Sequence, residues 1–329
     1  MNILVTGCFG FLGYNFIKFL EDNDLNFIGI DSLETNSAKN LFEISKNSSS
    51  SFYNLDICDL NDNDILKDKK ITAIVNFAAQ THVDNSISSP ELFINSNVLG
   101  VTSLLKFAMN NNIENILHIS TDEVYGSIEE GFFDEVNPFK PSSPYSASKA
   151  SAELICQAFN KTYDLNIKIA RPANNYGIYQ QPEKLIPFSI AQLLNGNNVE
   201  IYGKGQQIRH WLHVSDTVNG LFKILMDGEQ NEVYNIGSEE YLKNLDLIKI
   251  LLDIFELDEQ KITYVEDRPG HDYRYAINLD KIHNLGWKSE NNIQNSIFTI
   301  VDWYIKNKDF WSDDYIKILK NRKNRLNLL

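Results

Sequence analysis

Residues 1–13 read MNILVTGCFGFLG. The apolar run before the first glycine predicts a buried strand, and FLGYNFIKFLEDN at residues 11–23 has helical spacing. The glycines between them are spaced GxxGxxG, and a tight turn needs glycine where the backbone adopts a positive φ. A pyrophosphate can approach such a bare backbone and sit on the N-terminus of the following helix. The stretch therefore predicts a dinucleotide site made by Gly7, Phe9, Gly10, Phe11, Leu12 and Gly13.

A second apolar run, NFIGID at residues 26–31, ends in Asp31, at about the ~20-residue separation expected after such a turn. A carboxylate there accepts both ribose hydroxyls of NAD and repels the additional phosphate of NADP, and a helix cap or turn residue is the alternative. Two further strand ends supply candidates for the adenine and the middle of the cofactor, with ordinary packing the alternative for the alanines. These candidates are Asp56, Ile57, Ala78, Ala79 and Gln80.

Strand-like and helical segments alternate along the first half of the chain. Apolar strand patterns occupy residues 1–7, 26–31, 51–57, 71–79, 115–121 and 165–172, and helical patterns occupy residues 11–23, 90–111 and 144–163. Such alternation predicts an α/β protein with a Rossmann-type, doubly wound parallel sheet.

The pattern changes after Arg171, where loops lengthen. This predicts an NAD-binding domain at residues 1–172 and a smaller, mixed α/β substrate-binding lobe, mostly residues 173–329. VYNIG at residues 233–237 predicts a strand returning to the first domain, so the second lobe is discontinuous.

The bulk composition narrows the function classes. The 329 residues are 43% hydrophobic, enough for two lobes around one cleft. The net charge of −14 argues against broad binding of nucleic acid or anionic membranes. The 3 cysteines form no CxxC pair, so we expect reduced thiols in a cytoplasmic protein. We expect no signal peptide and no apolar run long enough to span a bilayer.

Tyr145 and Lys149 lie four residues apart at the start of a predicted helix. One helical turn puts them on one face. A lysine ammonium beside a phenol favours the phenolate and lowers the pKa of the phenol, which makes it a usable base for a sugar hydroxyl. A solvated Tyr–Lys pair is the alternative.

STDEVYG at residues 120–126 follows the buried-strand pattern ILHIS and places Asp122 and Glu123 at the end of that strand. In an open α/β sheet this end is where ligands bind, although an isolated Asp–Glu pair is more often a solvated turn.

Together the glycine turn, Asp31 and the YxxxK pair resemble the extended short-chain dehydrogenase/reductase family, which acts on nucleotide sugars with a bound nicotinamide cofactor. STDEVYG resembles the corresponding segment of the nucleotide-sugar 4,6-dehydratases, whereas epimerases carry small hydroxyl residues there. The resemblance implies Asp122 as acid, Glu123 as base, Thr121 as the residue orienting the carbon 4 oxygen, Tyr145 as acceptor of the hydroxyl proton, and Lys149 as partner of Tyr145 and of the nicotinamide ribose.

The chemistry of a dehydratase explains why two acidic residues are needed. Oxidation at carbon 4 makes the carbon 5 proton acidic, so a base removes it while an acid protonates the leaving carbon 6 hydroxyl. Two neighbouring carboxyl groups can divide these roles if one stays protonated, and close like charges raise one of the two pKa values. The hydride returns to carbon 6, so NAD is regenerated in each turnover and can stay bound.

The resemblance continues to residue 278. NFAAQTHVDNSI (76–87), RPANNYGIYQQPEKLIP (171–187), EIYGKGQQIRHW (200–211) and DRPGHDYRYAIN (267–278) match dehydratase segments. It implies that Ser96 and Asn175 contact the cofactor, that Arg209 holds the diphosphate and that Tyr202 stacks on the base. The remaining implied substrate contacts are Thr81, His82, Asn174, Lys184, Leu185, Glu200, Asn244, Arg268 and His271.

Several residues depart from the dehydratase pattern. Gln80 stands where Glu is common, Glu200 where Pro is usual and His210 where Asp is usual. Phe9 is bulky for its place in the glycine turn, so its ring should point away from the pyrophosphate.

The resemblance implies dTDP-glucose as the substrate, with UDP-glucose the alternative. A nucleotide-sugar 4-epimerase, a glucuronate decarboxylase and a non-catalytic NAD-binding regulator are further alternatives. It also implies a homodimer through residues 90–111 and 144–163. His82 and His118 lack the spacing of metal ligands, so we expect no metal.

Overall fold

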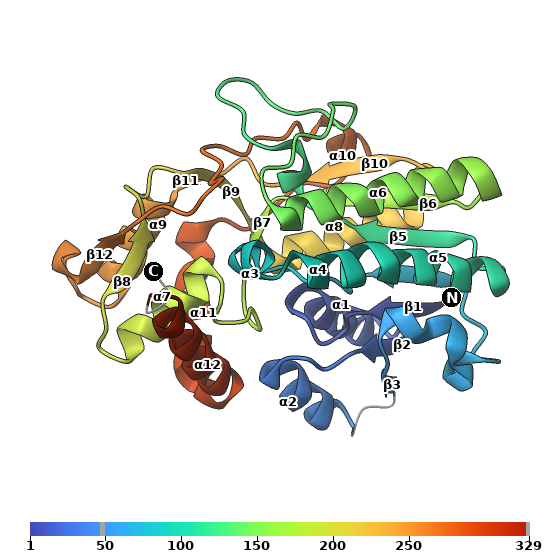
Figure 1. Ribbon diagram of the computed structural model, residues 1–329, viewed down its shortest axis with the longest axis horizontal. Helices are drawn as coiled ribbons and strands as arrows, with labels where there is room; N and C mark the ends of the chain where they lie inside the picture. The colour runs from blue at the N-terminus through green and yellow to red at the C-terminus, as the bar shows by residue number, and fades with distance from the viewer. Residues whose placement is uncertain (47–49, 327–329) are drawn as a thin grey trace.

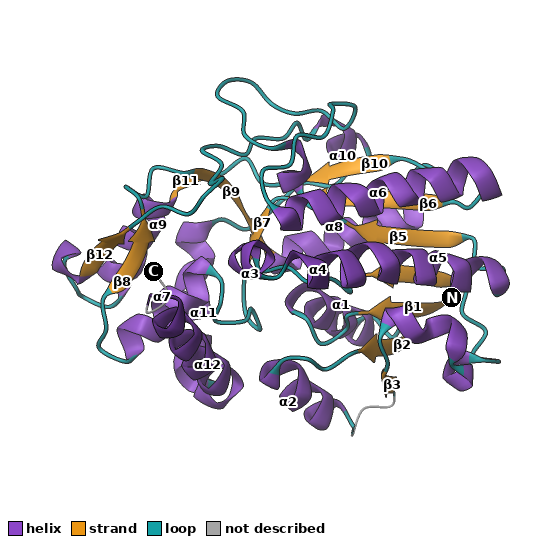
Figure 2. Cartoon of the chain, in the orientation of Figure 1, coloured by secondary structure: helices purple, strands orange, loops and turns teal. Residues whose placement is uncertain are grey.

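The computed structural model describes residues 1–46 and 50–326. Its largest element is a seven-stranded sheet in which every pairing is parallel, with the order β10-β6-β5-β4-β1-β2-β3 (Figures 1 and 2). The strands are β1 (Asn2–Thr6), β2 (Asn26–Asp31), β3 (Ser51–Asn54), β4 (Ala73–Asn76), β5 (Asn115–Ile119), β6 (Ile167–Pro172) and β10 (Val233–Ile236). The strand order reverses between β1 and β4, and the predicted Rossmann-type sheet is confirmed.

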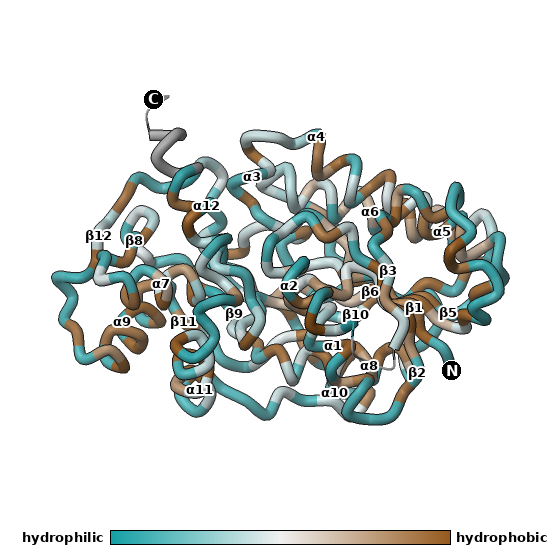
Figure 3. The backbone as a smooth tube through the Cα atoms, turned by 90° about the horizontal axis from the view of Figure 1, so that it is seen from below, coloured by the Kyte–Doolittle hydropathy of each residue, from teal (hydrophilic) through white to brown (hydrophobic). Residues whose placement is uncertain are grey.

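Both faces of this sheet are covered. In β1, Ile3 and Val5 join one hydrophobic core and Leu4 joins another, because successive side chains of a strand point to opposite faces. Helices α1 (Phe11–Asp22), α2 (Asn36–Ser45) and α8 (Val214–Asp227) contribute to the first core. Helices α5 (Gly100–Asn110) and α6 (Pro144–Tyr163) contribute to the second. Residues of high hydropathy accordingly gather around β1 (Figure 3).

The predicted helix at residues 90–111 is one continuous helix with a π-helical turn inside it. It comprises α4 (Pro90–Phe93), the turn Ile94–Leu99 and α5, and it follows the short helix α3 (Val83–Ser88). By length and composition alone Pro90–Asn110 is long and apolar enough to cross a membrane, a test that the core helix of a globular domain also passes. Its apolar residues Leu104, Leu105 and Ala108 nevertheless pack against the sheet, as in the core helix of a globular domain.

The smaller lobe contains two short sheets and a core of its own. One sheet has the order β11 (Tyr241–Lys243), β9 (Ile208–His213), β7 (Asn174–Tyr176), and the other pairs β12 (Ile262–Val265) with β8 (Val199–Tyr202). Its helices are α7 (Leu185–Leu194), α9 (Asn244–Ile254), α11 (Ile293–Lys306) and α12 (Lys308–Leu326). Strands and helices pack on a third hydrophobic core, so this lobe is mixed α/β as predicted.

Three elements beyond residue 172 join the large sheet or pack on its layers. β10 pairs with β6, α8 packs on α1 and β5, and α10 (Asp280–Asn284) packs on β10. The chain therefore crosses between the two parts more than once. The division at residues 172 and 173 stays a prediction.

Candidate active site

A cavity of about 760 Å³ lies at the carboxyl ends of β1, β2, β4 and β5, beside the point where the strand order reverses. Ligands of open parallel sheets bind at such a point. The predicted residues that line it are Gly7, Phe9, Gly10, Phe11, Leu12, Gly13, Asp31, Asp56, Ile57, Ala78, Ala79, Gln80, Thr81, His82, Ser96, Thr121, Glu123, Tyr145, Lys149, Asn174, Asn175 and Lys184. The predicted residues elsewhere are Asp122, Leu185, Glu200, Tyr202, Arg209, Asn244, Arg268 and His271.

The glycine turn brings bare backbone to the floor of this cavity. Gly7 has a φ of 62°, and a Cβ there would lie 2.7 Å from the backbone nitrogen of Ala78. A Cβ on Gly13 would lie 2.1 Å from the carbonyl oxygen of Gly7. Both positions therefore require glycine, and the turn leads directly into α1. This is a cradle that fits a pyrophosphate.

Phe9 points away from the cavity, as predicted. Its ring is fully buried and packs against Tyr14, Phe42 and Phe52 at centroid distances of 5.2 to 6.2 Å. Its backbone N–H donates to Asp31 Oδ2 over 2.9 Å. The bulky residue thus leaves the pyrophosphate cradle open.

Asp31 closes the same turn from the end of β2. Its other carboxylate oxygen accepts from the backbone N–H of Leu33 over 2.8 Å, and burial raises the pKa of the carboxyl group. Each oxygen keeps capacity to accept a ribose hydroxyl. Glycine cradle and carboxylate together fit an NAD molecule.

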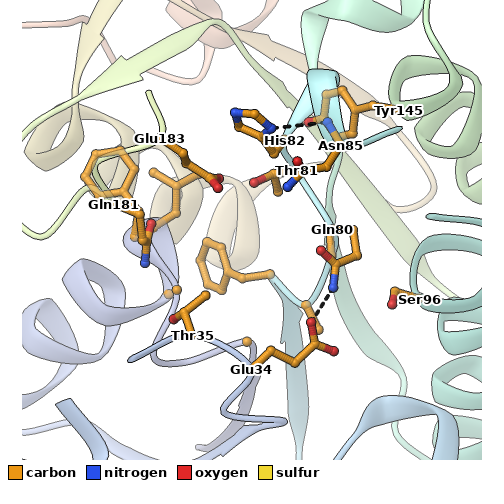
Figure 4. Close-up of a pocket in the computed structure, with 18 of the residues that line it drawn as sticks. Glu34, Thr35, Gln80, Thr81, His82, Asn85, Ser96, Tyr145, Gln181 and Glu183 are labelled. Atoms are coloured by element: carbon orange, nitrogen blue, oxygen red, sulfur yellow. Dashed lines mark hydrogen bonds between the residues drawn. The ribbon is translucent and has the colours of Figure 1, made fainter. Parts of the chain in front are cut away.

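The contacts of Gln80 explain why an amide stands where the dehydratase pattern commonly has Glu. Its side-chain amide donates to Glu34 Oε2 over 2.5 Å, and Figure 4 shows the two side chains meeting at the cavity wall. A glutamate at position 80 would place two carboxylates in contact at this site. The amide therefore matches the acidic residue opposite.

The first turns of α6 carry Tyr145 and Lys149 into the cavity. Ser143 and Ser146 form a capping box at the N-terminus of the helix. Lys149 Nζ donates to the carbonyl oxygen of Ile119 over 2.5 Å, and burial lowers the pKa of its ammonium group to about 8. The ammonium group is thus held at the end of β5.

The predicted lowering of the phenol pKa by Lys149 is wrong for this arrangement. Burial raises the pKa of Tyr145 well above its ordinary value, and the negative charge of Glu123 raises it further. A hydrogen bond with Thr121 acts in the opposite direction. Desolvation and a nearby carboxylate outweigh the lysine, whose ammonium group is engaged by the Ile119 carbonyl.

Asp122 and Glu123 begin a short 3₁₀ turn, Asp122–Tyr125, directly after β5. Asp122 is 2% exposed, and burial, followed by the charge of Glu123, raises the pKa of Asp122 to about 8. Within the described chain its Oδ2 atom has no hydrogen-bond partner. Burial also raises the pKa of Glu123, whereas the cations Arg268, Lys184 and Arg209 lower it. The acidic pair thus differs in exposure and in surroundings.

The predicted nucleotide contacts lie beyond this pair, in the smaller lobe. Tyr202 on β8 donates its hydroxyl to Asp84 Oδ2 over 3.0 Å, and Arg268 pairs with Asp84 Oδ1 at 3.5 Å. Asp84 belongs to α3 of the larger domain. One carboxylate therefore connects the two lobes, and no motif in the sequence indicated it.

Arg209 is 4% exposed and turned toward the protein. Its guanidinium group lies 4.1 Å from the ring centroid of Tyr275, and it donates to the carbonyl oxygens of Ile208, Asp272 and Tyr273. Its positive charge still acts on the acidic pair, because it lowers the pKa of both Asp122 and Glu123.

Two histidines of this end also have protein partners. His271 Nδ1 lies 2.6 Å from Asp267 Oδ1, and burial and the charge of Arg268 lower the pKa of His271 to about 4. His210 is buried with Nδ1 2.8 Å from the carbonyl oxygen of Ser238, and burial lowers its pKa to about 4. Both imidazoles are therefore neutral near pH 7. Leu185 and Asn244 begin α7 and α9, and Glu200 lies on β8.

Comparison with known proteins decides the family. Residues 4–299 match the family model described as GDP-mannose 4,6 dehydratase. The chain belongs to this dehydratase family. It is 42% identical to the low-salt glycan biosynthesis protein Agl12 of Haloferax volcanii, over 93% of this chain and 99% of that protein. It is 39% identical to a dTDP-glucose 4,6-dehydratase of Escherichia coli, over 94% of each.

A solved structure extends the likeness to three dimensions. DesIV, a dTDP-glucose 4,6-dehydratase from Streptomyces venezuelae, matches this dehydratase-family chain with a TM-score of 0.90 and 38% identity. The match covers 94% of this chain and 99% of DesIV. The resemblance inferred from the motifs is thereby confirmed.

A buried ion pair supports the reacting end of this dehydratase-family fold, and it was also missed. Glu153 lies one turn beyond Lys149 on α6, fully buried, and accepts from Arg171 Nη2 over 2.6 Å and from Arg171 Nε. Glu153 also accepts from the Ser120 hydroxyl, immediately before the acidic turn. Arg171 Nη1 donates to the Tyr125 hydroxyl over 2.5 Å, at the other end of that turn.

This pair fixes the acidic turn of the dehydratase against α6 and the sheet. It also affects charge, because Glu153 raises the pKa of Lys149 against the larger effect of burial. Glu153 and Arg171 each have apolar neighbours in the sequence, in AELIC and IAR, which is a weak local signal for a buried charge. No cluster of three His, Cys, Asp or Glu side chains arranged for a metal occurs in residues 1–46 and 50–326.

Proposed function

We propose that this chain is an NAD-dependent dTDP-glucose 4,6-dehydratase, a hydro-lyase that makes dTDP-4-keto-6-deoxyglucose. One observation carries the proposal: a buried Asp122 with a pKa of about 8 stands beside Glu123, next to the cavity that contains Tyr145 and Lys149. Epimerisation at carbon 4 requires no second acid, whereas elimination of water requires both an acid and a base. Several dTDP-glucose 4,6-dehydratases, at 38 to 40% identity over most of the chain, support it.

NAD is the cofactor that fits the cavity. The glycine turn offers bare backbone, and Asp31 offers a carboxylate for ribose hydroxyls while disfavouring the phosphate of NADP. DesIV, which shares this fold, was solved with NAD bound. When bound, NAD accepts a hydride from carbon 4 of the sugar and later returns it to carbon 6.

Tyr145 and Thr121 act on the carbon 4 oxygen. Tyr145 takes the proton of the carbon 4 hydroxyl, and its hydrogen bond with Thr121 lowers the pKa of the phenol against the larger raising effects of burial and Glu123. Lys149 holds its ammonium group against the Ile119 carbonyl and adds positive charge to the same end of the cavity. The resulting ketone makes the neighbouring carbon 5 proton acidic.

Glu123 and Asp122 then eliminate water. Glu123 borders the cavity, and three nearby cations favour its ionised form, as a base for the carbon 5 proton requires. Asp122 is kept protonated near neutral pH by burial and by Glu123, as an acid for the carbon 6 hydroxyl requires. Different surroundings thus assign two roles to two adjacent carboxyl groups.

The diphosphate and the base occupy the smaller lobe in this proposal. Arg209 and Arg268 supply positive charge for the diphosphate, and Tyr202 supplies a ring for the base. Lys184, whose Nζ now donates to the Thr81 carbonyl over 2.8 Å, lies between this group and the cavity. Asn174 Oδ1 is buried without a hydrogen-bond partner in the described chain, which suits a sugar hydroxyl.

The dehydratase is proposed to be a cytoplasmic homodimer. Leu92, Ile94 and Leu99 on the helix Pro90–Asn110 and Leu154 on α6 are exposed. Exposed apolar side chains on adjacent helices are typical of a subunit interface. Leu99→Glu is expected to convert the dimer to a monomer in light scattering, and an unchanged mass would contradict this interface.

The test of the function is mass spectrometry of products after separate incubation with dTDP-, UDP-, CDP- and GDP-glucose. Loss of one water from dTDP-glucose is the expected result. Loss of water from UDP-glucose instead would keep the reaction and replace the nucleotide. Conversion of glucose to galactose at unchanged mass would show an epimerase.

A further inference from the structure

The C-terminal helix α12 borders the cofactor cavity. Asp314, Lys317 and Ile318 line it together with Glu34, Thr35 and other residues that follow β2. The end of β2 is where the ribose of the adenosine is recognised in this type of sheet. Residues nearly three hundred positions apart therefore meet at the adenosine end.

Two hydrogen bonds hold α12 against the larger domain. Asp314 is 8% exposed, and its two carboxylate oxygens accept from the backbone N–H groups of Asn36 over 3.2 Å and Ser37 over 2.9 Å. These N–H groups belong to the first turn of α2, where a helix leaves backbone donors unpaired and favours a negative charge. Figure 1 shows α12 beside α2.

The other side of α12 is fixed in the smaller lobe. Trp311 and Tyr315 are buried in its core. The Trp311 indole donates to the Tyr304 carbonyl over 2.9 Å, and the Tyr315 hydroxyl donates to Gln192 over 2.5 Å. The helix thus contacts both lobes and borders the cavity between them.

A column of aromatic rings connects the C-terminal helices to the glycine turn. Phe310 of α12 packs on Tyr179, Tyr179 packs on Tyr14 of α1, and Tyr14 packs on Phe9, at centroid distances of 5.8, 4.7 and 6.2 Å. Phe9 is the bulky residue in the glycine turn that precedes α1. It is the last ring of this column, and it also contacts Phe42 of α2.

We propose that α12 forms the outer wall of the NAD site at the adenosine end, and that Asp314 holds this wall closed on α2 so that NAD is retained between turnovers. Lys317 adds a positive charge to this end of the cavity, which is otherwise lined by the carboxylates of Asp31, Glu34, Asp56 and Asp314. Retention suits a reaction in which the cofactor is regenerated in every cycle. This inference rests on the proposed NAD-dependent function.

The test measures exchange of radiolabelled NAD from the purified protein against an excess of unlabelled NAD, without sugar substrate. Asp314→Ala removes both hydrogen bonds and keeps a helix-favouring residue, so NAD is expected to leave about tenfold faster. Asp313→Ala is the matched control, because Asp313 is an exposed neighbour on the same helix. It is expected to release NAD at the wild-type rate.

A second pair of variants addresses the wall itself and does not depend on the stability of α12. Lys317 and Lys320 are both exposed, and only Lys317 lines the cavity in the described chain. Lys317→Ala is expected to speed release about two- to threefold, a typical effect of one exposed charge, with Lys320→Ala unchanged.

The outcomes separate the two proposals. Release from Asp314→Ala and Lys317→Ala at the rates of their controls would overturn the proposed wall while leaving the NAD site intact. A wild-type protein that binds no NAD would overturn the NAD-dependent function and the wall with it.

Discussion

The cofactor end of the site is lined by backbone turns and strand ends, whereas the nucleotide end is lined by long polar side chains that bind one another. At the cofactor end Gly7, Gly13 and Asp31 border an open cavity of about 760 Å³. At the nucleotide end Asp84 engages Tyr202 and Arg268. A site built from backbone groups already has its binding shape before the ligand binds. A site built from paired side chains must break those pairs before the side chains can contact the ligand.

The acidic turn stands between these two ends, and Asp122→Asn should have the largest effect. The amide keeps the size of the side chain and cannot donate the proton of a carboxylic acid, so kcat is expected to fall about 10²- to 10⁴-fold. Steady-state rates of product formation measure this. The amount of bound NAD serves as the control and should match wild type. A kcat within threefold of wild type would remove Asp122 from the mechanism.

The acidic turn depends on the buried pair of Glu153 and Arg171. Glu153→Gln leaves a buried guanidinium group without its counter-charge, so the free energy of unfolding is expected to fall by about 3–5 kcal/mol. Urea unfolding measures it. Asp302→Asn, in the exposed pair of Asp302 with Lys306, is the control and should cost less than about 1 kcal/mol. An equal loss of unfolding free energy in both variants would show that the buried pair does not support the acidic turn.

The pH dependence of kcat should report the same reacting end. Burial raises the pKa of Asp122 to about 8 and lowers the pKa of Lys149 to about 8, so both groups carry a proton below pH 8 and lose it above. Since the acid and the ammonium group both act in their protonated forms, kcat is expected to fall as pH rises through about 8. Loss of one proton lowers the rate about tenfold per pH unit, and well above pH 8, where both groups have lost theirs, the fall should approach about a hundredfold per unit. A rate independent of pH up to 10 would contradict these assignments.

The difference between the cofactor end and the nucleotide end also explains which parts of the site could be predicted from the sequence. The glycine turn with Asp31, and Tyr145 with Lys149, are each encoded by short-range spacing in a strand–turn–helix or a single helix. The orientation of Phe9 followed from the need for an open cradle. The strands and the parallel sheet followed from their alternation with helices.

The missed features depend on contacts between distant segments. Asp84 meets Arg268, and Asp314 meets Asn36, only after both lobes have folded. The pKa of Tyr145 was predicted in the wrong direction for a related reason. Its neighbour Lys149 is visible in the local sequence, whereas the burial and the charge of Glu123 that outweigh it come from tertiary structure.

The smallest expected effect tests whether the nucleotide end must rearrange. Asp84→Asn keeps an oxygen for the Tyr202 hydroxyl and removes the charge that pairs with Arg268. If Asp84 competes with the diphosphate for Arg268, the KM for the nucleotide sugar should fall about threefold, the size of a partly exposed ion pair, with kcat and NAD exchange unchanged.

Arg268→Ala is the matched variant with the opposite expected effect on KM. It removes the cation itself and should raise KM about tenfold. The sign of the Asp84→Asn effect is therefore decisive. A higher KM in both variants would mean that Asp84 holds Arg268 in its binding position. The nucleotide end would then be preformed as the cofactor end is, and the difference between the two would lie only in the groups that build them.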